Sequence, residues 1–153
     1  MDTYYFLDTQ TLWMIKHLTL AAILGMAIGF EREHRGKPAG LRTYTLVGLG
    51  AALFTMLSVS GVFGTLSDPT RIAANVVVGI GFIGGGLIFL KGEKLEGLTT
   101  AAGLWTTAAI GMAVGFGLTA VAVYTTILVL LILWAMRAVE DRIHQGLEKN
   151  SDS

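Results

Sequence analysis

Five apolar segments follow one another along the chain, and each is long enough to cross a bilayer as a helix. About 20 helical residues span the hydrocarbon core of a membrane. The segments lie at residues 11–30, 43–63, 71–90, 98–116 and 118–136. Because polar stretches or short glycine-containing links separate them, the pattern predicts an all-α fold, a polytopic bundle of five transmembrane helices.

The composition of the 153-residue chain agrees with one membrane domain. Hydrophobic residues make up 53% of the chain and charged residues 14%, whereas soluble proteins average about 25% charged residues. Net charge is formally zero, so no nucleic-acid partner is expected. Only Asp2 and Asp8 are charged before Lys16, which is the wrong start for a signal peptide. We expect a transmembrane domain at residues 1–137 and a short polar cytoplasmic tail at 138–153.

The positions of lysine and arginine predict the orientation of the bundle. Basic residues collect on the cytoplasmic side of membrane proteins. With the N-terminus outside, only Lys16 and Arg71 lie toward the outer side. The other basic residues fall in the first loop, the third loop and the tail: Arg32, Arg35, Lys37, Arg42, Lys91, Lys94, Arg137, Arg142 and Lys149. The sequence therefore predicts an N-out, C-in topology.

The fourth and fifth spans are joined by little more than Gly115 to Gly117, which predicts an antiparallel helical hairpin. The fifth span carries branched and large residues all round, so we place it on the lipid-facing periphery. The other four spans carry small residues at helical spacing, which allow close backbone approach in lipid. These are Ala21, Gly25, Gly29, Gly48, Ala52, Ser60, Gly81, Gly85, Gly103, Thr107, Gly111 and Gly115.

These small-residue faces predict a tight four-helix core, a subunit interface, or both. A homo-oligomer is expected, and a dimer is the commonest symmetric assembly. Gly79 to Gly84 also match the spacing G-x-G-x-x-G. A dinucleotide site needs that pattern at a strand-to-helix turn, whereas here it lies inside an apolar span, so helix packing is the better interpretation. A second interpretation is that Gly84 to Gly86 unwind the helix and expose carbonyl groups to a cavity.

Asp68 and Pro69 are placed to cap and begin the third span. Capping leaves Arg71 and Asn75 unexplained. These two residues stand at i and i+4 on one face, with Asn75 about one turn into the apolar region. A polar group at that depth is expected to be buried inside the bundle as contact between helices, with a ligand or ion contact as the alternative.

The densest charge cluster runs from Glu31 to Thr43, where Glu31 and Arg42 flank the ends of two spans. It is an ordinary positive-inside loop, or else an ion-pair network, a cation site or a docking surface in which Glu33 also takes part. The three histidines are dispersed and the chain has no cysteine, so no metal site, cofactor or thiol chemistry is predicted. No catalytic set of residues lies within the spans, and an enzyme is not expected.

Several of these motifs together resemble the MgtC/SapB family of bacterial inner-membrane proteins, in order from about Leu20 to Arg137. The resemblance rests on five segments: Gly25 to Glu33 (with Gly29-Phe30-Glu31-Arg32-Glu33), Ala39-Gly40-Leu41-Arg42-Thr43, Asp68-Pro69-Thr70-Arg71-Ile72-Ala73-Ala74, Gly79-Ile80-Gly81-Phe82, and Leu98-Thr99-Thr100-Ala101-Ala102-Gly103-Leu104-Trp105.

The resemblance implies a multi-pass protein of the bacterial inner membrane, with a link to growth in low magnesium or acid. For the best-known members it implies virulence, through regulators reported to restrain the rotary ATP synthase. Many members carry a cytosolic ACT-like domain after the last span. This chain ends 16 residues after Arg137, which favours a shorter, SapB-like protein.

Two classes of function are left open. In the first, the protein is a membrane regulator that binds another membrane complex through a small-residue helix face. In the second, it is a channel or transporter for Mg²⁺ or another small solute, for which the spans offer the polar set Asn75, Thr99, Thr100, Thr106 and Thr107. The candidate functional residues are Glu31, Glu33, Arg42, Asp68, Arg71, Asn75, Thr99, Thr100 and Trp105. The candidate packing residues are Gly25, Gly29, Gly81, Gly85, Gly103 and Gly111.

Overall fold

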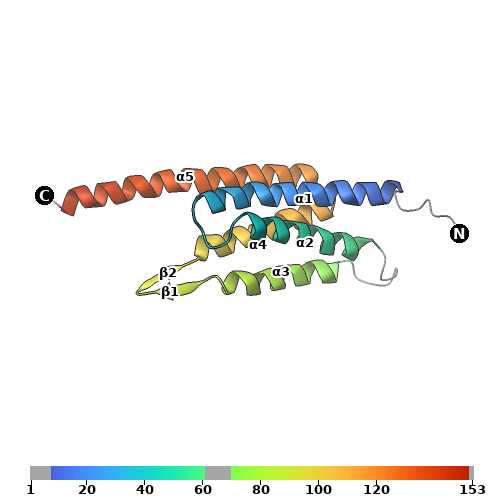
Figure 1. The fold of residues 1–153 in the computed structure, drawn as a ribbon, viewed down its shortest axis with the longest axis horizontal. Coiled ribbons are helices and arrows are strands. Elements are labelled where there is room, and N and C mark those ends of the chain that lie inside the picture. Colours follow the sequence, from blue (N-terminus) through green and yellow to red (C-terminus); the bar gives the residue numbers. More distant parts are fainter. Residues whose placement is uncertain (1–7, 61–69, 152–153) are drawn as a thin grey trace.

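The structure, a computed structural model, describes residues 8–60 and 70–151, and Figure 1 shows five helices side by side. The helices are α1 (Thr9–His34), α2 (Leu41–Val59), α3 (Thr70–Gly85), α4 (Leu98–Gly115) and α5 (Thr119–Ser151). Successive helices run in opposite directions, and α1 begins at the opposite end of the bundle from the end of α5. The predicted five-helix membrane bundle is confirmed. Four of the helices, all except α3, are long and apolar enough to cross a membrane.

Helix α4 occupies the centre of the fold, since it contacts each of the other four helices. Half of its most apolar stretch is buried inside the chain, against 11% for α5. Helix α5 contacts only α1 and α4 extensively, and its last turns run past the bundle as a single helix (Figure 1). The prediction that the fifth span is peripheral is confirmed. The residues expected to form a polar tail continue α5 to Ser151.

The predicted hairpin between the fourth and fifth spans is also confirmed. Helix α4 ends at Gly115, and the chain reverses within three residues before α5 begins at Thr119. Gly117 takes a positive φ of 80°, a conformation that glycine adopts without steric cost. Its N–H donates to the carbonyl of Val114 at 2.9 Å, which closes the turn.

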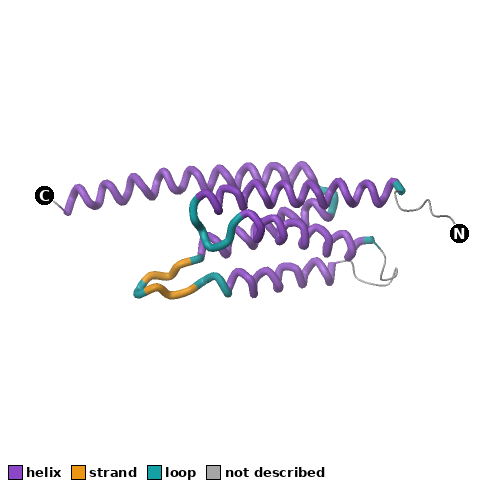
Figure 2. Tube along the Cα trace, viewed as in Figure 1, coloured by secondary structure: helices purple, strands orange, loops and turns teal. Residues whose placement is uncertain are grey.

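Helix α3 is shorter than the sequence predicted, because it ends at Gly85 rather than continuing to Leu90. Three consecutive glycines, the residues least suited to a helix after proline, stand at its end. The following residues form a two-stranded antiparallel hairpin, β1 (Phe89–Lys91) and β2 (Lys94–Glu96), drawn in orange in Figure 2. The prediction of a continuous 20-residue third span was therefore wrong.

Glycines on α1, α2 and α4 bring these three helices into backbone contact. A Cβ on Gly25 would lie 2.5 Å from the carbonyl oxygen of Tyr44, and one on Gly48 would lie 3.0 Å from that of Ala21. A Cβ on Gly111 would overlap the carbonyl oxygen of Gly48. Since no side chain fits at these positions, the predicted tight packing holds for Gly25 and Gly111.

On α3 the predicted packing within the core is not seen at Gly81 and Gly85, and the alternative of a subunit interface stays a prediction there. A Cβ on Gly79, Gly81 or Gly85 would meet nothing within 4 Å. Only Gly84 faces a neighbour, with Ala101 of α4 at 3.5 Å from its Cβ position. The reason is that α3 contacts only α2 and α4 extensively and lies at the edge of the bundle, which leaves open space beside these glycines.

Candidate functional site

A buried arginine lies where the last turn of α1 meets the start of α4. Arg32 is 5% exposed, and its Nη2 donates to Thr100 Oγ1 at 3.4 Å. Its Nε is buried without a hydrogen-bond partner. Arg32 follows Gly25 and Gly29 on the buried stripe of α1. That spacing of four and three residues is the signal in the sequence that could have placed Arg32 inside the bundle.

Tyr44 of α2 completes this buried cluster and was not singled out from the sequence. Its ring is fully buried, and its hydroxyl donates to the carbonyl oxygen of Thr100 at 3.2 Å. Three predicted packing glycines make room for it. A Cβ on Gly103 would lie 2.5 Å from the hydroxyl, and one on Gly29 would lie 2.9 Å from the Cβ of Tyr44. Gly25 meets the carbonyl of the same tyrosine.

Glu31 is the counter-ion of two arginines. Its Oε1 lies 3.2 Å from Arg35 Nε, and its Oε2 lies 3.7 Å from Arg32 Nη1. Oε2 is buried and accepts no hydrogen bond. The predicted ion-pair network is therefore present at Glu31, although its partners are Arg32 and Arg35. Arg42, the other charged residue singled out at the end of a span, takes no part in this network.

Glu33 has a separate role at the start of α2. Gly40 occupies the N-cap position and offers no side chain to cap the helix. The Glu33 carboxylate supplies the missing acceptor, since its Oε2 accepts the N–H of Leu41 at 2.7 Å. A negative charge also suits the positive end of the helix dipole. Glu33 thus fixes the α1–α2 connection.

The structure describes only two of the three polar residues singled out at the start of the third span. Asp68 lies outside the described residues, so its proposed capping role is not seen. Asn75 is exposed and its Nδ2 donates to the carbonyl oxygen of Arg71 at 3.0 Å. Burial of Asn75 between helices was therefore a wrong prediction, because α3 lies at the edge of the bundle and leaves this position open to the outside. Arg71 is likewise exposed.

The remaining candidates on α4 separate into buried and exposed positions. Thr100 is 2% exposed and contacts both Arg32 and Tyr44, as described above. Thr99 is exposed, and Trp105 is 51% exposed on the outside of the bundle. Only Thr100 among them belongs to the buried cluster. Among the described residues no group of three His, Cys, Asp or Glu could hold a metal ion.

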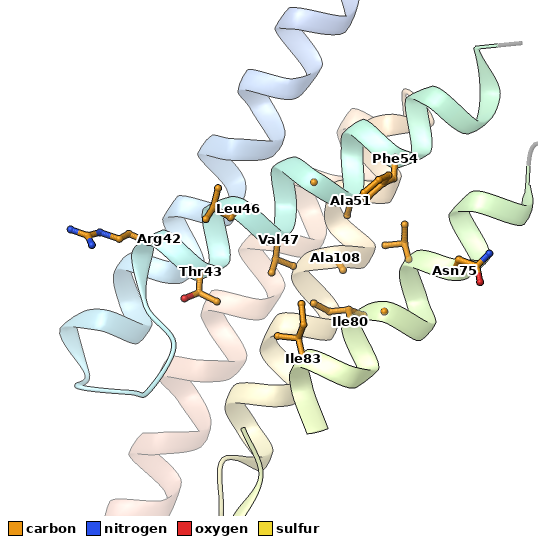
Figure 3. Close-up of a pocket in the computed structure, with 13 residues that line it drawn as sticks. Arg42, Thr43, Leu46, Val47, Ala51, Phe54, Asn75, Ile80, Ile83 and Ala108 are labelled. Carbon is orange, nitrogen blue, oxygen red and sulfur yellow. The ribbon is translucent and has the colours of Figure 1, made fainter. Parts of the chain in front are cut away.

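A groove separates α2 from α3, and it has a volume of about 630 Å³. Figure 3 shows its lining as a row of apolar side chains, with Arg42 and Asn75 at opposite ends. Its lining includes Arg42, Leu46, Gly50, Asn75, Gly79 and Ile83. Neither carboxylate of the first loop lines it. Within the described part of the chain, the Arg42 side chain is exposed and forms no hydrogen bond or ion pair.

A family profile and several curated proteins match this chain, and all of them point to the same family. The profile of the MgtC family matches residues 18–142. The chain is 50% identical over 130 residues to YhiD of Escherichia coli K12, which is named as a candidate magnesium transporter; the match covers 81% of this chain and 60% of YhiD. It is 51% identical over 110 residues to Protein MgtC of Brucella abortus strain 2308, covering 72% of this chain and 45% of that protein.

A third relative, Protein MgtC of Salmonella typhimurium strain 14028s, is 43% identical over 131 residues, with 86% of this chain and 55% of the relative covered. The chain thus spans about half the length of the curated relatives it matches. No solved structure matches it.

Proposed function

The chain belongs to the MgtC family, and on that premise we propose that it is the membrane part of a regulator of magnesium homeostasis in the bacterial inner membrane. It acts without catalysis, by binding another membrane complex such as the ATP synthase. The magnesium link draws on the names of the relatives.

The outer face of α3 carries this proposal. Val78 and Phe82 are 72% and 86% exposed, and Gly81 between them leaves open space where a side chain would project. Gly25, Gly48 and Gly111 are closed by neighbouring helices of the same chain, whereas this face is unused within the chain. In lipid, small residues with large flanking side chains favour close packing of a second helix.

Magnesium transport is the second candidate, favoured by the name of the Escherichia coli relative and by the buried polar atoms of Glu31 and Arg32. Two observations weigh against it. Helices α2, α3 and α4 contain no acidic residue, and the glycine contacts described above close the interior with backbone. A cation crossing the bundle would therefore meet no carboxylate on α2, α3 or α4.

Growth in low magnesium tests the regulatory proposal. Gly81→Leu fills the outer face of α3 without a clash in the chain itself, so we expect normal abundance but loss of complementation. Ala120→Leu also introduces a leucine, at an exposed position of α5, and should complement normally. Equal growth of both variants, at equal abundance, would contradict a binding role for this face.

Two further measurements separate the candidates. Because the chain has no cysteine, Val78→Cys introduces a single crosslinking position. Crosslinks between identical chains would identify the homodimer that we also propose, and crosslinks to ATP synthase subunits would identify the larger complex. Uptake of Mg²⁺ into proteoliposomes by the wild-type chain, abolished by Glu31→Gln, would instead favour the transporter.

A further inference from the structure

We propose that the groove between α2 and α3 is a binding site for an anionic phospholipid, whose acyl chain lies along the apolar lining while its phosphate contacts Arg42. The proposal concerns a different surface from the function proposed above, which uses the outer face of α3, although Phe82 borders both surfaces.

The groove continues along the bundle toward the end that carries the basic loop. A second hollow, lined by Pro38, Phe82 and Leu87 among others, shares Thr43 and Ile83 with the first. The two hollows together follow the α2–α3 seam from Asn75 to the α1–α2 loop. An elongated apolar ligand with one polar end matches this shape better than a compact solute.

The charge of Arg42, unpaired among the described residues, determines which headgroup the ligand carries. Glu31 compensates Arg32 and Arg35, as their distances show, and Glu33 is engaged at the start of α2. Arg42 is left with an exposed guanidinium that contacts no acceptor within the described part of the chain. A guanidinium binds phosphate through paired hydrogen bonds, and basic pockets between transmembrane helices on the cytoplasmic side hold anionic lipid headgroups.

The lining argues against a divalent cation as the occupant. No acidic residue lines either hollow, so a divalent cation would find no carboxylate there. The apolar side chains of the lining instead suit an acyl chain.

Two glycines allow the groove to be filled without disturbing the fold. A Cβ on Gly50 or Gly79 would meet nothing within 4 Å, and both residues line the groove. Gly50→Leu therefore places a side chain where the acyl chain is proposed to lie. Gly81→Leu is the matched control, because Gly81 has equal open space but lines neither hollow.

The test uses the full chain in mild detergent and measures bound lipid by native mass spectrometry. The probes are phosphatidylglycerol and phosphatidylcholine with identical acyl chains. We expect the wild-type chain to retain phosphatidylglycerol preferentially, and Arg42→Gln to weaken that binding about tenfold, as loss of a charge-assisted contact implies. Lys94→Gln, which removes a charge from the β-hairpin, should leave binding unchanged. Gly50→Leu should abolish the binding of both lipids. Gly81→Leu should leave the binding of each lipid unchanged.

Equal retention of the two lipids by the wild-type chain, or undiminished phosphatidylglycerol binding by Arg42→Gln, would overturn the proposal. A photo-crosslinker at Leu46, which lines the groove and is 66% exposed, gives an independent readout in cells. Crosslinked phospholipid supports the proposal, and a crosslinked polypeptide in its place contradicts it. Since Gly81→Leu tests the outer face of α3 and Gly50→Leu tests the groove, either proposal can fail alone.

Discussion

Glu31 holds two arginines at the end of α1, and its surroundings make the carboxylate important for stability. Its side chain is 18% exposed, so its charge is partly shielded from water and its contacts count for more than those of a surface pair. Arg32 in turn contacts Thr100 of α4. The carboxylate thus indirectly ties the first helix to the central one.

We predict that Glu31→Gln lowers the free energy of unfolding by roughly 1.5–3 kcal/mol, the range for hydrogen bonds to charged groups. The variant keeps the shape of the side chain but leaves Arg32 and Arg35 uncompensated. Glu96→Gln is the control: Glu96 pairs with Lys91 at 3.8 Å at an exposed site and should cost about 0–1 kcal/mol. Thermal unfolding in detergent measures both, and equal costs would contradict a special role for Glu31.

At this scale the sequence identified Glu31 and Thr100 but missed Arg32 and Tyr44 as members of one cluster. Both lie on the small-residue stripes of their helices, four or fewer residues from a packed glycine, and this periodicity was available. What the sequence could not supply was the rotation of α1, α2 and α4 about one another. That rotation results from many backbone contacts at glycines, and no single residue encodes it.

Among the elements, the prediction of a membrane-spanning helix holds for α1, α2, α4 and α5. The exception is α3. Its apolar residues continue to Leu90, so hydropathy alone favoured a full span. The helix ends at Gly85 because three glycines weaken it and the following residues pair as a β-hairpin with Phe89 opposite Glu96. Local propensity thus outweighed hydrophobic length. The alternative of a helix broken at these glycines was the nearer prediction.

Some glycines have a neighbouring helix against their Cβ position and others have open space there, and this difference gives a direct prediction for α2 and α4. Gly111→Ala would push a methyl group onto the Gly48 carbonyl, and backbone cannot yield as a flexible side chain does. We expect a loss of roughly 1–3 kcal/mol in stability, as for overpacked cores. Gly50→Ala, with nothing within 4 Å of its Cβ position, should be neutral or slightly stabilising. Similar unfolding temperatures for the two variants would contradict the packing described for α4.

For the whole molecule, basic residues from separate loops lie at one end of the bundle. The α1–α2 loop, the β-hairpin and the C-terminal end of α5 share one end (Figure 1), and the start of α1 and the α4–α5 turn share the other. The first end carries Arg35, Lys37, Lys91 and Lys94. The α4–α5 turn contains no charged residue. The fold therefore gathers basic residues that are distant in the sequence, which supports the predicted orientation.

The orientation itself is a prediction that reporter fusions can test. Alkaline phosphatase, which folds only outside the cytoplasm, should be active when fused after Asp8 or inserted at Ser67, and inactive in the hairpin at Gly92 or after Lys149. Gly92 is exposed at a tight turn with φ of 63°, so an insertion there should be tolerated. A fluorescent protein that matures only inside provides the reciprocal control at each position. Phosphatase activity at Lys149 would overturn the N-out, C-in topology and would also place Arg42, the proposed phosphate contact, in the outer leaflet.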